Sequence, residues 1–251
     1  MEEVEVLDVP VARLTAAAAR EELVRLYERD RPALVAYANA HTLNLASRDS
    51  AYRAVLRSAD IVLNDGAGLA IAGRIFGRPF PDNLNGSDFN PVILEEAVER
   101  GWPVFFLGAR PGVADEATRR LSERIPGLKV CGTRDGYFDP SESGDVARTV
   151  AAAGAGVLMV AMGNPLQEKW LSRHLEATGA RLGVGVGAFL DFSAGVVPRA
   201  PAWMNRLWLE WVYRLLQEPR RMWRRYVLGN PLFLARVLRA RLTLRWRKPY
   251  A

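Results

Sequence analysis

The chain has 251 residues, 49% of them apolar, and carries a formal net charge of +6. This size and composition suit one large or two small domains with a buried core, and they exclude a disordered chain. The single cysteine, Cys131, excludes a disulfide scaffold and fits a reducing compartment; with the two histidines, His41 and His174, it cannot build a closed structural zinc site. We expect no secretory signal, because no basic segment precedes an apolar stretch with a cleavage site. We also expect no membrane-spanning helix, because no run of about 18 apolar residues occurs.

Short apolar runs alternate with helical patterns through the middle of the chain. The elements that these patterns predict are, in chain order, a strand at Ala33–Ala38, a helix at Thr42–Ser58, a strand at Ile61–Asn64, helices at Ala67–Phe76 and Ser87–Arg100, a strand at Pro103–Leu107, a helix at Val113–Arg124, a strand at Leu128–Cys131, a helix at Ser143–Ala153, a strand at Val157–Ala161, a helix at Leu166–Thr178 and a strand at Arg181–Val186. Strands that alternate with helices of about 10–15 residues indicate right-handed crossovers. The predicted fold class is therefore α/β, with a mostly parallel sheet and helices on both faces.

Glycines and polar residues gather where the predicted strands end. They are Asn39, Asp65-Gly66, Gly108-Ala109-Arg110, Gly136-Tyr137, Gly163-Asn164 and Gly187 with Asp191. Ligands of parallel α/β sheets bind outside the carboxyl ends of the strands, where backbone N–H groups and helix N-termini favour phosphates. A single glycine at such a turn is explained as well by steric need, so it is the whole set that points to a phosphate or nucleotide ligand.

Several common nucleotide and hydrolase motifs do not fit. The run Gly183–Gly187 suggests a dinucleotide site, but it lacks the final G-x-x-G spacing, and no acidic residue is placed about 20 residues later to bind a ribose. The sequence therefore gives little support to a nicotinamide enzyme. It contains no Walker motif, no G-x-S-x-G nucleophile elbow and no Asp-x-Asp pair that would hold a divalent ion against a diphosphate.

The last 53 residues differ in charge from the rest of the chain. Residues 199–251, called the tail below, hold thirteen basic and two acidic side chains, a net charge of +11, whereas residues 1–198 carry −5. Five of the seven tryptophans also lie in the tail, at Trp203, Trp208, Trp211, Trp223 and Trp246. A basic, aromatic tail on an acidic body predicts an anionic partner: a membrane surface, a nucleic acid or a phosphorylated substrate.

A set of short motifs spread over nearly the whole chain points to one family. The set consists of Asn39 with Asp65-Gly66-Ala67-Gly68, the segment Phe106–Val113, Gly136-Tyr137-Phe138, the segment Met162–Trp170, Gly185-Val186-Gly187 with Asp191 and Gly195, and Arg199-Ala200-Pro201 followed by Leu209–Arg214 and Glu218–Arg221. In this order the motifs resemble the WecG/TagA/CpsF family of bacterial glycosyltransferases. The resemblance implies a Rossmann-like catalytic core over residues 1–198 and a helical appendage over residues 199–251. It also implies transfer of a sugar from a UDP-sugar to a polyprenyl-diphosphate-linked sugar, with inversion and without a metal or other cofactor.

Inverting transfer needs a base that takes the proton from the acceptor hydroxyl. We predict that Asp65 is this base, because it lies between a buried strand and Gly66, and because the resemblance places the proposed base at this Asp-Gly pair. The alternative is that Asp65 caps the helix that starts near Ala67. Asn39 matches an asparagine of the family and is predicted to orient the donor sugar or its diphosphate.

The donor nucleotide is predicted to bind along the remaining strand ends. The residues proposed to contact the UDP-sugar are Gly108, Ala109, Arg110, Gly136, Tyr137, Gly163, Asn164, Gln167, Glu168 and Asp191. Gln167 suits a uracil edge or a ribose hydroxyl, and Glu168 suits a ribose hydroxyl or the positive end of a helix. Local capping is the alternative for these side chains. The chain departs from the family's pattern at Tyr37, Asn83 and Leu166, where the family commonly has threonine, arginine and a basic residue.

Arginines of the tail are predicted to neutralise the diphosphate. Arg214, Arg221 and Arg224 are seven and three residues apart, which aligns them on one helical face, and guanidinium groups match phosphate oxygens. We expect two tail helices that meet near Glu218-Pro219, because proline suits the first turn of a helix. The resemblance implies that arginines of the appendage complete the active site over the diphosphate.

Apolar tail residues recur at helical spacing beside these arginines. They are Trp203, Leu207, Trp208, Trp211, Val212, Leu215, Trp223, Tyr226 and Val227. Interleaved Trp and Arg suit a helix that lies in the headgroup region of an anionic membrane, so we expect a cytoplasmic protein bound peripherally to the inner face of the cell membrane. The alternative is a helix packed on the core or on another subunit, which leaves a homo-oligomer open.

Other functions remain as alternatives. A nucleic-acid binder would use the basic tail, but no recognition motif accompanies it, and we expect no nucleic-acid partner. A non-catalytic sensor would bind a UDP-sugar without forming product. Within the family, the favoured donor is UDP-N-acetylmannosamine and the favoured acceptor is polyprenyl-diphosphate-linked N-acetylglucosamine, for cell-surface polysaccharide or teichoic acid synthesis. A transferase that uses UDP-glucose or UDP-glucuronate to make exopolysaccharide is the alternative.

Overall fold

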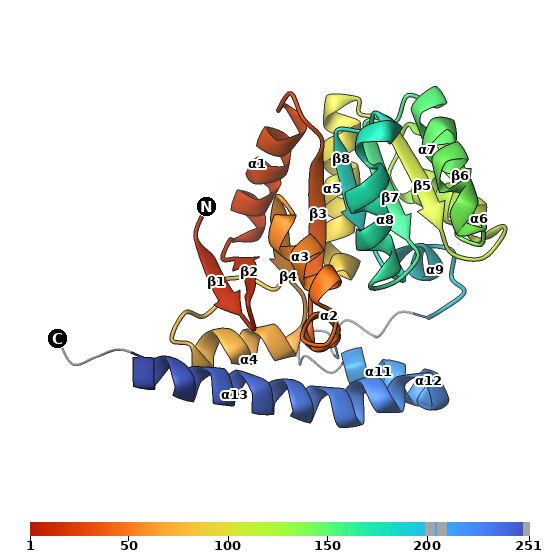
Figure 1. Ribbon diagram of the computed structural model, residues 1–251. Coiled ribbons are helices and arrows are strands. Elements are labelled where there is room, and N and C mark those ends of the chain that lie inside the picture. The colour runs from red at the N-terminus through yellow and green to blue at the C-terminus, as the bar shows by residue number, and fades with distance from the viewer. Residues whose placement is uncertain (199–203, 205–209, 248–251) are drawn as a thin grey trace.

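A six-stranded parallel sheet forms the centre of the protein (Figure 1). The computed structural model describes residues 1–198, 204 and 210–247. The strand order is β4-β3-β8-β7-β5-β6, with β3 at Ala33–Ala38, β4 at Ile61–Asn64, β5 at Val104–Gly108, β6 at Val130–Arg134, β7 at Val157–Ala161 and β8 at Leu182–Gly185. All neighbouring strands in it are parallel, which confirms the predicted α/β class. Within this sheet, every strand except the edge strand β6 is buried along its whole length, because helices cover both faces. Strands of this kind have continuous apolar sequences.

The helices divide between the two faces of the sheet. One face is covered by α1 (Ala16–Tyr27), α5 (Gly86–Arg100), α6 (Val113–Arg124) and α9 (Phe189–Ser193). The other face is covered by α2 (Ala40–Ala46), α3 (Ser50–Ser58), α7 (Ser143–Ala152) and α8 (Leu166–His174), with a 3-10 turn at Pro140–Glu142 before α7. Successive strand residues point to opposite faces, so the strands contribute side chains to the apolar packing on both faces of the sheet.

Two predicted helices are shorter than expected. The segment predicted as one helix, Thr42–Ser58, is two helices, α2 and α3, because Asp49 accepts a hydrogen bond from the Tyr52 N–H at 2.9 Å and starts a new helix. The helix predicted to reach Thr178 ends at His174 and is followed by the 3-10 turn Glu176–Thr178.

The amino-terminal part of the chain contains elements beyond those predicted. The strands β1 (Glu3–Val6) and β2 (Val9–Ala12) form an antiparallel hairpin whose valines are buried against α3 and the helix α4 (Ala67–Ile75), and α1 follows it. The strand predicted at Leu128–Cys131 lies instead at β6, because the pairing of Val130 with Val104 of β5 sets its start.

The tail folds back against the body (Figure 1). Its described elements are α11 (Glu210–Gln217), α12 (Pro219–Trp223), a π-helical turn at Arg224–Leu228 and α13 (Gly229–Arg247). The predicted junction is confirmed, since Pro219 is the first residue of α12. α13 crosses α2 and α4 (Ala67–Ile75), and its Phe233 and Val237 are completely buried in the same apolar cluster as those helices. None of the helices in the described part of the chain combines the length and the apolar character needed to cross a membrane.

Candidate active site

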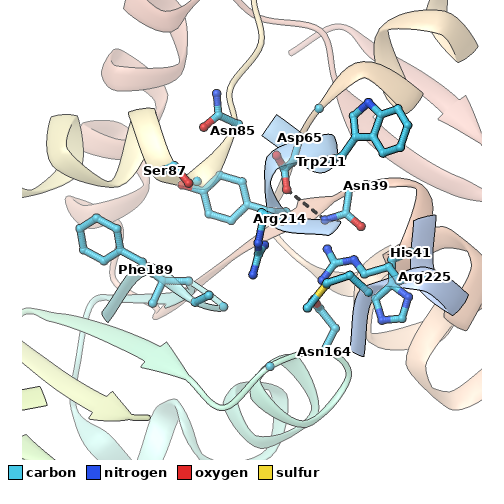
Figure 2. Close-up of a pocket in the computed structure, with 18 of the residues that line it drawn as sticks. Asn39, His41, Asp65, Asn85, Ser87, Asn164, Phe189, Trp211, Arg214 and Arg225 are labelled. Atoms are coloured by element: carbon cyan, nitrogen blue, oxygen red, sulfur yellow. Dashed lines mark hydrogen bonds between the residues drawn. The ribbon is translucent and has the colours of Figure 1, made fainter. Parts of the chain in front are cut away.

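The carboxyl ends of the strands and the tail helices line a cleft of about 2270 Å³ (Figure 2). The predicted residues that line it are Asn39, Asp65, Ala109, Arg110, Gly136, Tyr137, Gly163, Asn164, Gln167, Asp191 and Arg214. The structure does not bring Gly108, Glu168 or Arg224 to the cleft wall. The side chain of Arg221 lies outside the described part of the structure.

The cleft includes the point where the chain reverses its direction across the sheet. The connection after β5 leads outward to β6, whereas the connection after the adjacent strand β7 leads the other way to β8. Ala109 and Arg110 follow β5, and Gly163 and Asn164 follow β7, so the two turns form opposite walls of a crevice. Parallel α/β sheets bind nucleotides at such points, which makes this crevice the candidate site for a donor nucleotide.

Asp65 follows β4 and lies in the cleft (Figure 2). Its backbone N–H donates to the Ala38 carbonyl at 2.8 Å, and its carboxylate accepts a hydrogen bond from Asn39 Nδ2 at 3.0 Å. Gly66, with a φ of +84° that suits glycine, is the N-cap of α4, and no side chain makes a capping hydrogen bond there. The alternative role of Asp65 as a helix cap is therefore not realised.

The surroundings of Asp65 act on its pKa in both directions. Burial raises the pKa of this carboxyl above its usual value of 3.8, and the charge of Asp88 also raises it. The hydrogen bond from Asn39 and the charges of Arg225 and Arg214 lower the pKa, but less than burial raises it. A carboxylate with a raised pKa accepts a proton more readily, which suits a general base.

Asn39 holds both the start of α2 and the carboxylate of Asp65. Its Oδ1 accepts hydrogen bonds from the Thr42 N–H at 3.0 Å and the Thr42 hydroxyl at 3.1 Å, which caps the helix. This capping fixes the amide so that Nδ2 faces Asp65. The structure therefore makes Asn39 a residue that orients Asp65.

The loop before α5 supports the Asp65-Gly66 turn from the other side. Asn83 Oδ1 accepts a hydrogen bond from the Gly66 N–H at 2.9 Å, and Asn64 Nδ2 donates to the Asp82 carbonyl at 2.9 Å. Asn83, which departs from the family's pattern, thus has a defined role in holding this turn. Tyr37 is the other departure near Asp65, and its hydroxyl donates to Asn90 Oδ1 of α5 at 2.7 Å.

Two tail arginines face Asp65. Arg214 of α11 and Arg225 of the π-helical turn both line the cleft, and both act electrostatically on Asp65. Arg214 is further held by Phe192 of α9, whose ring centre lies 5.1 Å from the guanidinium carbon. Positive charge is therefore concentrated opposite the candidate base.

The predicted Arg224 is replaced in the cleft by its neighbour Arg225. Arg224 is exposed, and its guanidinium lies over the Trp223 ring at 5.4 Å. Met222 is buried and defines the inner face of this helix. Arg225 follows Met222 by three residues and shares its face, whereas Arg224 follows by two and points to the opposite side.

His41 also lines the cleft and was not predicted as a site residue. It lies in the first turn of α2, beside Arg225 in Figure 2. Burial, together with the charge of Arg225, lowers the pKa of His41 to about 4, so the imidazole is neutral near pH 7. Its sequence position, two residues after Asn39, was the available signal. Other lining residues beyond the predicted set are Asn85, Ser87, Asp88 and Trp211.

Gly108 does not line the nucleotide crevice, but it allows the turn after β5 to approach the end of β7. A Cβ at this position would lie 2.5 Å from the backbone carbonyl of Ala161, and the φ of +131° also requires glycine. The close approach lets the Ala109 N–H donate to the Ala161 carbonyl at 2.9 Å. Gly108 is therefore explained by the steric alternative, in which the turn needs a glycine for lack of space. Ala109 and Arg110, which follow it, are the residues of this turn that line the cleft.

Gln167 and Glu168 form a buried network rather than an open binding edge. Gln167 Oε1 accepts hydrogen bonds from the Gly163 N–H at 3.1 Å and the Gly187 N–H at 3.0 Å, and its Nε2 donates to Glu168 Oε1 at 2.7 Å. Glu168 is completely buried, so it cannot reach a ribose without rearrangement. Burial raises the pKa of Glu168 to about 7, although the hydrogen bonds that it accepts lower it in part.

The raised pKa of Glu168 predicts a pH-dependent stability. Between its usual pKa of 4.5 and about 7, the folded protein binds this proton more tightly than the unfolded chain, so the free energy of unfolding falls as pH rises. We expect the difference in melting temperature between Glu168→Gln and the wild type to shift in favour of the variant as pH is raised from about 5 to about 8. Thermal unfolding followed by circular dichroism measures this difference.

Glu96 provides the matched control. It is also buried; burial alone would raise its pKa, but hydrogen bonds from Arg100 and Arg20 hold the pKa below the usual value. Glu96 is therefore ionised in both states over the same pH range, and Glu96→Gln should show no such trend. A flat difference for Glu168→Gln would contradict the raised pKa.

In residues 1–198, 204 and 210–247, no cluster of three or more His, Cys, Asp or Glu side chains is arranged to hold a metal ion. The arginines that line the cleft in these residues are Arg110, Arg214 and Arg225.

Comparisons with known proteins agree with the motifs. The model of the glycosyl transferase WecG/TagA/CpsF family matches residues 4–247. A relative from Bacillus spizizenii strain W23, named N-acetylglucosaminyldiphosphoundecaprenol N-acetyl-beta-D-mannosaminyltransferase, is 33% identical over 93% of this chain and 89% of its own length. A relative of the same name from Bacillus subtilis strain 168 is 31% identical over 82% of this chain and 79% of its own length.

Proposed function

Because the chain belongs to the WecG/TagA/CpsF family of glycosyl transferases, we propose that it transfers N-acetylmannosamine from a UDP-linked donor to N-acetylglucosaminyl-diphosphoundecaprenol, the acceptor in its relatives' names. One observation carries this proposal: Asp65 faces Arg214 and Arg225 across a cleft at the carboxyl ends of a parallel sheet. A base and two cations in that arrangement suit a displacement in which a proton is lost and a diphosphate leaves.

The proposed reaction is a single displacement. The acceptor hydroxyl oxygen forms a bond to C1 of the donor sugar while the bond from C1 to the UDP oxygen breaks, and the hydroxyl proton passes to Asp65. The relatives' names specify a β-linked product, which requires inversion when the sugar is α-linked in the donor. The electron pair of the broken bond stays with UDP, so negative charge grows on the diphosphate as the bond breaks.

We propose that arginines take the place of a divalent cation at the diphosphate. Arg214 and Arg225 approach the cleft from the tail, and guanidinium groups bind phosphate oxygens in a bidentate way. Because they are fixed before the reaction, they stabilise the developing charge without reorganisation. On this proposal, a chelator leaves the rate unchanged, whereas loss of activity that manganese restores would contradict it.

The function is tested by a donor screen. The purified protein is incubated with a short-chain polyprenyl-diphosphate N-acetylglucosamine and one donor at a time: UDP-N-acetylmannosamine, UDP-glucose or UDP-glucuronate. The masses of the products are measured by mass spectrometry. We expect the acceptor to gain one N-acetylhexosamine with the first donor only. Transfer from UDP-glucose or UDP-glucuronate alone would favour the exopolysaccharide alternative, and UDP binding without any product would favour a sensor.

The exposed side of α13 supports binding of the protein to the membrane that holds the acceptor lipid. Phe233 and Val237 are buried against the body, but a second apolar stripe on the same helix and the preceding turn is exposed. This outer stripe consists of Leu228, Leu232, Leu238 and Leu242. Two further exposed apolar residues, Ile71 and Val227, line the cleft. With the net charge of +11 in the tail, the stripe fits the interface of an anionic bilayer that holds a polyprenyl chain.

The outer stripe differs from the stripe predicted for lipid contact. Trp211 and Tyr226 line the cleft, with ring centres 6.0 Å apart, so packing within the tail uses them. Trp223 and Val227 are exposed, and Val212 and Leu215 are half-buried. Trp203, Leu207 and Trp208 lie outside the described residues.

The outer stripe yields a prediction for membrane binding. The double variant Leu238→Glu/Leu242→Glu should lose most of its flotation with liposomes that contain anionic lipid, because two carboxylates enter the apolar interface. Ala151→Glu/Ala152→Glu is the matched control, since it adds the same charge to exposed positions of α7. Equal flotation of the wild type and both variants would reject the outer stripe as a membrane contact.

A further inference from the structure

The buried pair Gln167 and Glu168 joins the two turns that follow β7 and β8. Gln167 is only 2% exposed but lines the cleft, and its neighbour Glu168 is completely buried. Gln167 Oε1 accepts one N–H from Gly163, after β7, and one from Gly187, after β8. This one oxygen therefore sets the separation of two turns that line the cleft.

Gln167 can accept these two hydrogen bonds in only one orientation of its amide. If the amide were rotated by half a turn, its NH₂ group would face the two N–H donors of Gly163 and Gly187, and four donors would meet without an acceptor. Glu168 Oε1 accepts from Gln167 Nε2 at 2.7 Å and so selects the productive orientation. The same oxygen accepts from Asn164 Nδ2 at 2.7 Å, which fixes a second residue of the cleft wall.

Two further features show that the space around Glu168 is adapted to the network. Gly185 of β8 faces it, and a Cβ at that position would lie 2.9 Å from Gln167 Nε2 and 3.0 Å from Glu168 Oε1. The other carboxylate oxygen, Oε2, accepts a hydrogen bond from the Tyr52 hydroxyl of α3 at 3.1 Å. The carboxylate is thus bonded on both oxygens inside the protein, and no part of it is left to contact a substrate.

We propose that Glu168 is a positioning residue for the nucleotide donor: it orients the Gln167 amide and thereby holds the turns after β7 and β8 at the separation that the donor requires. This proposal rests on the proposed function, because the nucleotide crevice is taken as the donor site. It assigns Glu168 no contact with substrate and no proton transfer. Loss of its acceptor oxygen should therefore impair donor binding and leave the chemical step nearly unchanged.

The variant that removes the acceptor is Glu168→Met, which has a similar length and no carboxylate. We expect the KM for the UDP-sugar, and the Kd for UDP measured by calorimetry, to rise roughly tenfold, with kcat changed less than about threefold. Glu168→Gln keeps an oxygen that can accept from Gln167 and Asn164, so it should restore most of the donor affinity. A tenfold effect of Glu168→Gln would instead indicate direct contact or proton transfer and would overturn the proposal.

A double-variant cycle tests whether Glu168 acts through Gln167. Gln167→Met should raise the donor KM by a similar factor. The double variant should be no worse than either single variant, because the first change already removes the hydrogen bonds that connect the two turns. Additive effects would show that Glu168 acts by another route. Tyr52→Phe is the comparison variant: it removes the hydrogen bond to the other carboxylate oxygen and the acceptor that Asn164 Nδ2 contacts at 3.2 Å, but it leaves both hydrogen bonds to Glu168 Oε1 in place. Its expected effect on KM is less than about threefold.

The outcomes separate this proposal from the proposed function. If the wild type binds UDP and transfers the sugar but Glu168→Met has an unchanged donor KM, the positioning role alone is wrong. If the wild type binds neither UDP nor UDP-sugar, the proposed function itself fails. Should Glu168→Met not fold, as judged by circular dichroism, Glu168→Gln and the Gln167→Met comparison still decide between positioning and direct contact.

Discussion

Replacing Asp65 with asparagine should lower kcat for sugar transfer by about 10³-fold and leave the fold intact. The amide keeps the size of the carboxylate and can still meet Asn39 of the adjacent strand end, but it cannot take the proton of the acceptor hydroxyl. Because the change affects the chemical step, donor KM should stay within about threefold of the wild-type value. Steady-state kinetics with product detection by mass measures both quantities.

The pH profile gives a second readout of the same base. Asp65 works only when ionised, so kcat/KM should fall as pH drops through its pKa, which burial raises above 3.8. The charge of Asp88 raises that pKa and the charge of Arg225 lowers it. Asp88→Asn should therefore shift the acid limb to lower pH, and Arg225→Ala should shift it to higher pH. A limb that stays in place in both variants, or near-wild-type turnover in Asp65→Asn, would remove Asp65 from the mechanism.

Replacing Arg225 with alanine should lower kcat by about 10²–10³-fold, whereas Arg224→Ala should change it less than about threefold. The two residues are neighbours of the same type in the same turn, so they form a matched pair. Only Arg225 lines the cleft and acts on Asp65, while Arg224 lies over Trp223 at the surface. Removing Arg225 takes away a cation that stabilises the leaving diphosphate.

A lysine at the same position refines the interpretation. Arg225→Lys keeps the charge but loses the planar pair of donors that binds two phosphate oxygens, so its kcat should lie between those of the wild type and the alanine variant. Circular dichroism checks that each variant is folded. If Arg224→Ala is as impaired as Arg225→Ala, or more so, the inner face of this helix is not the one that the structure indicates.

The parallel sheet was largely predictable because its strands are buried on both faces. A strand covered by helices on both sides needs apolar residues at every position, so β3, β5 and β7 stand out as continuous apolar runs. The amino-terminal hairpin was harder to recognise, because its four-residue strands are not continuous apolar runs: β1 alternates exposed and buried residues, and β2 contains the half-buried Pro10. The division of residues 42–58 into two helices depended on one cap at Asp49.

The candidate site was predictable as a set of strand ends and less so as a set of roles. Asn39 and Asp65 were predicted as site residues, but their hydrogen bond requires that β3 and β4 be neighbours in the sheet. Gln167 and Glu168 were predicted to contact the nucleotide, whereas the structure encloses them in a network with Tyr52 of α3, a residue 116 positions away from Glu168. Burial of this kind depends on the packing of α3 against α8, which the local sequence does not specify.

The sequence by itself determined the class of sheet, the strand ends that hold the polar residues, the family and the charge difference between body and tail, since these depend on local composition and on the order of motifs. Only the tertiary structure decided which arginine enters the cleft. The spacing of Arg221 and Arg224 placed them on a common face of the helix, but spacing carries no information about which face turns inward. The inward face is the one that contains Met222, which is buried in the protein, and Arg225 on the same face therefore lines the cleft with Asp65.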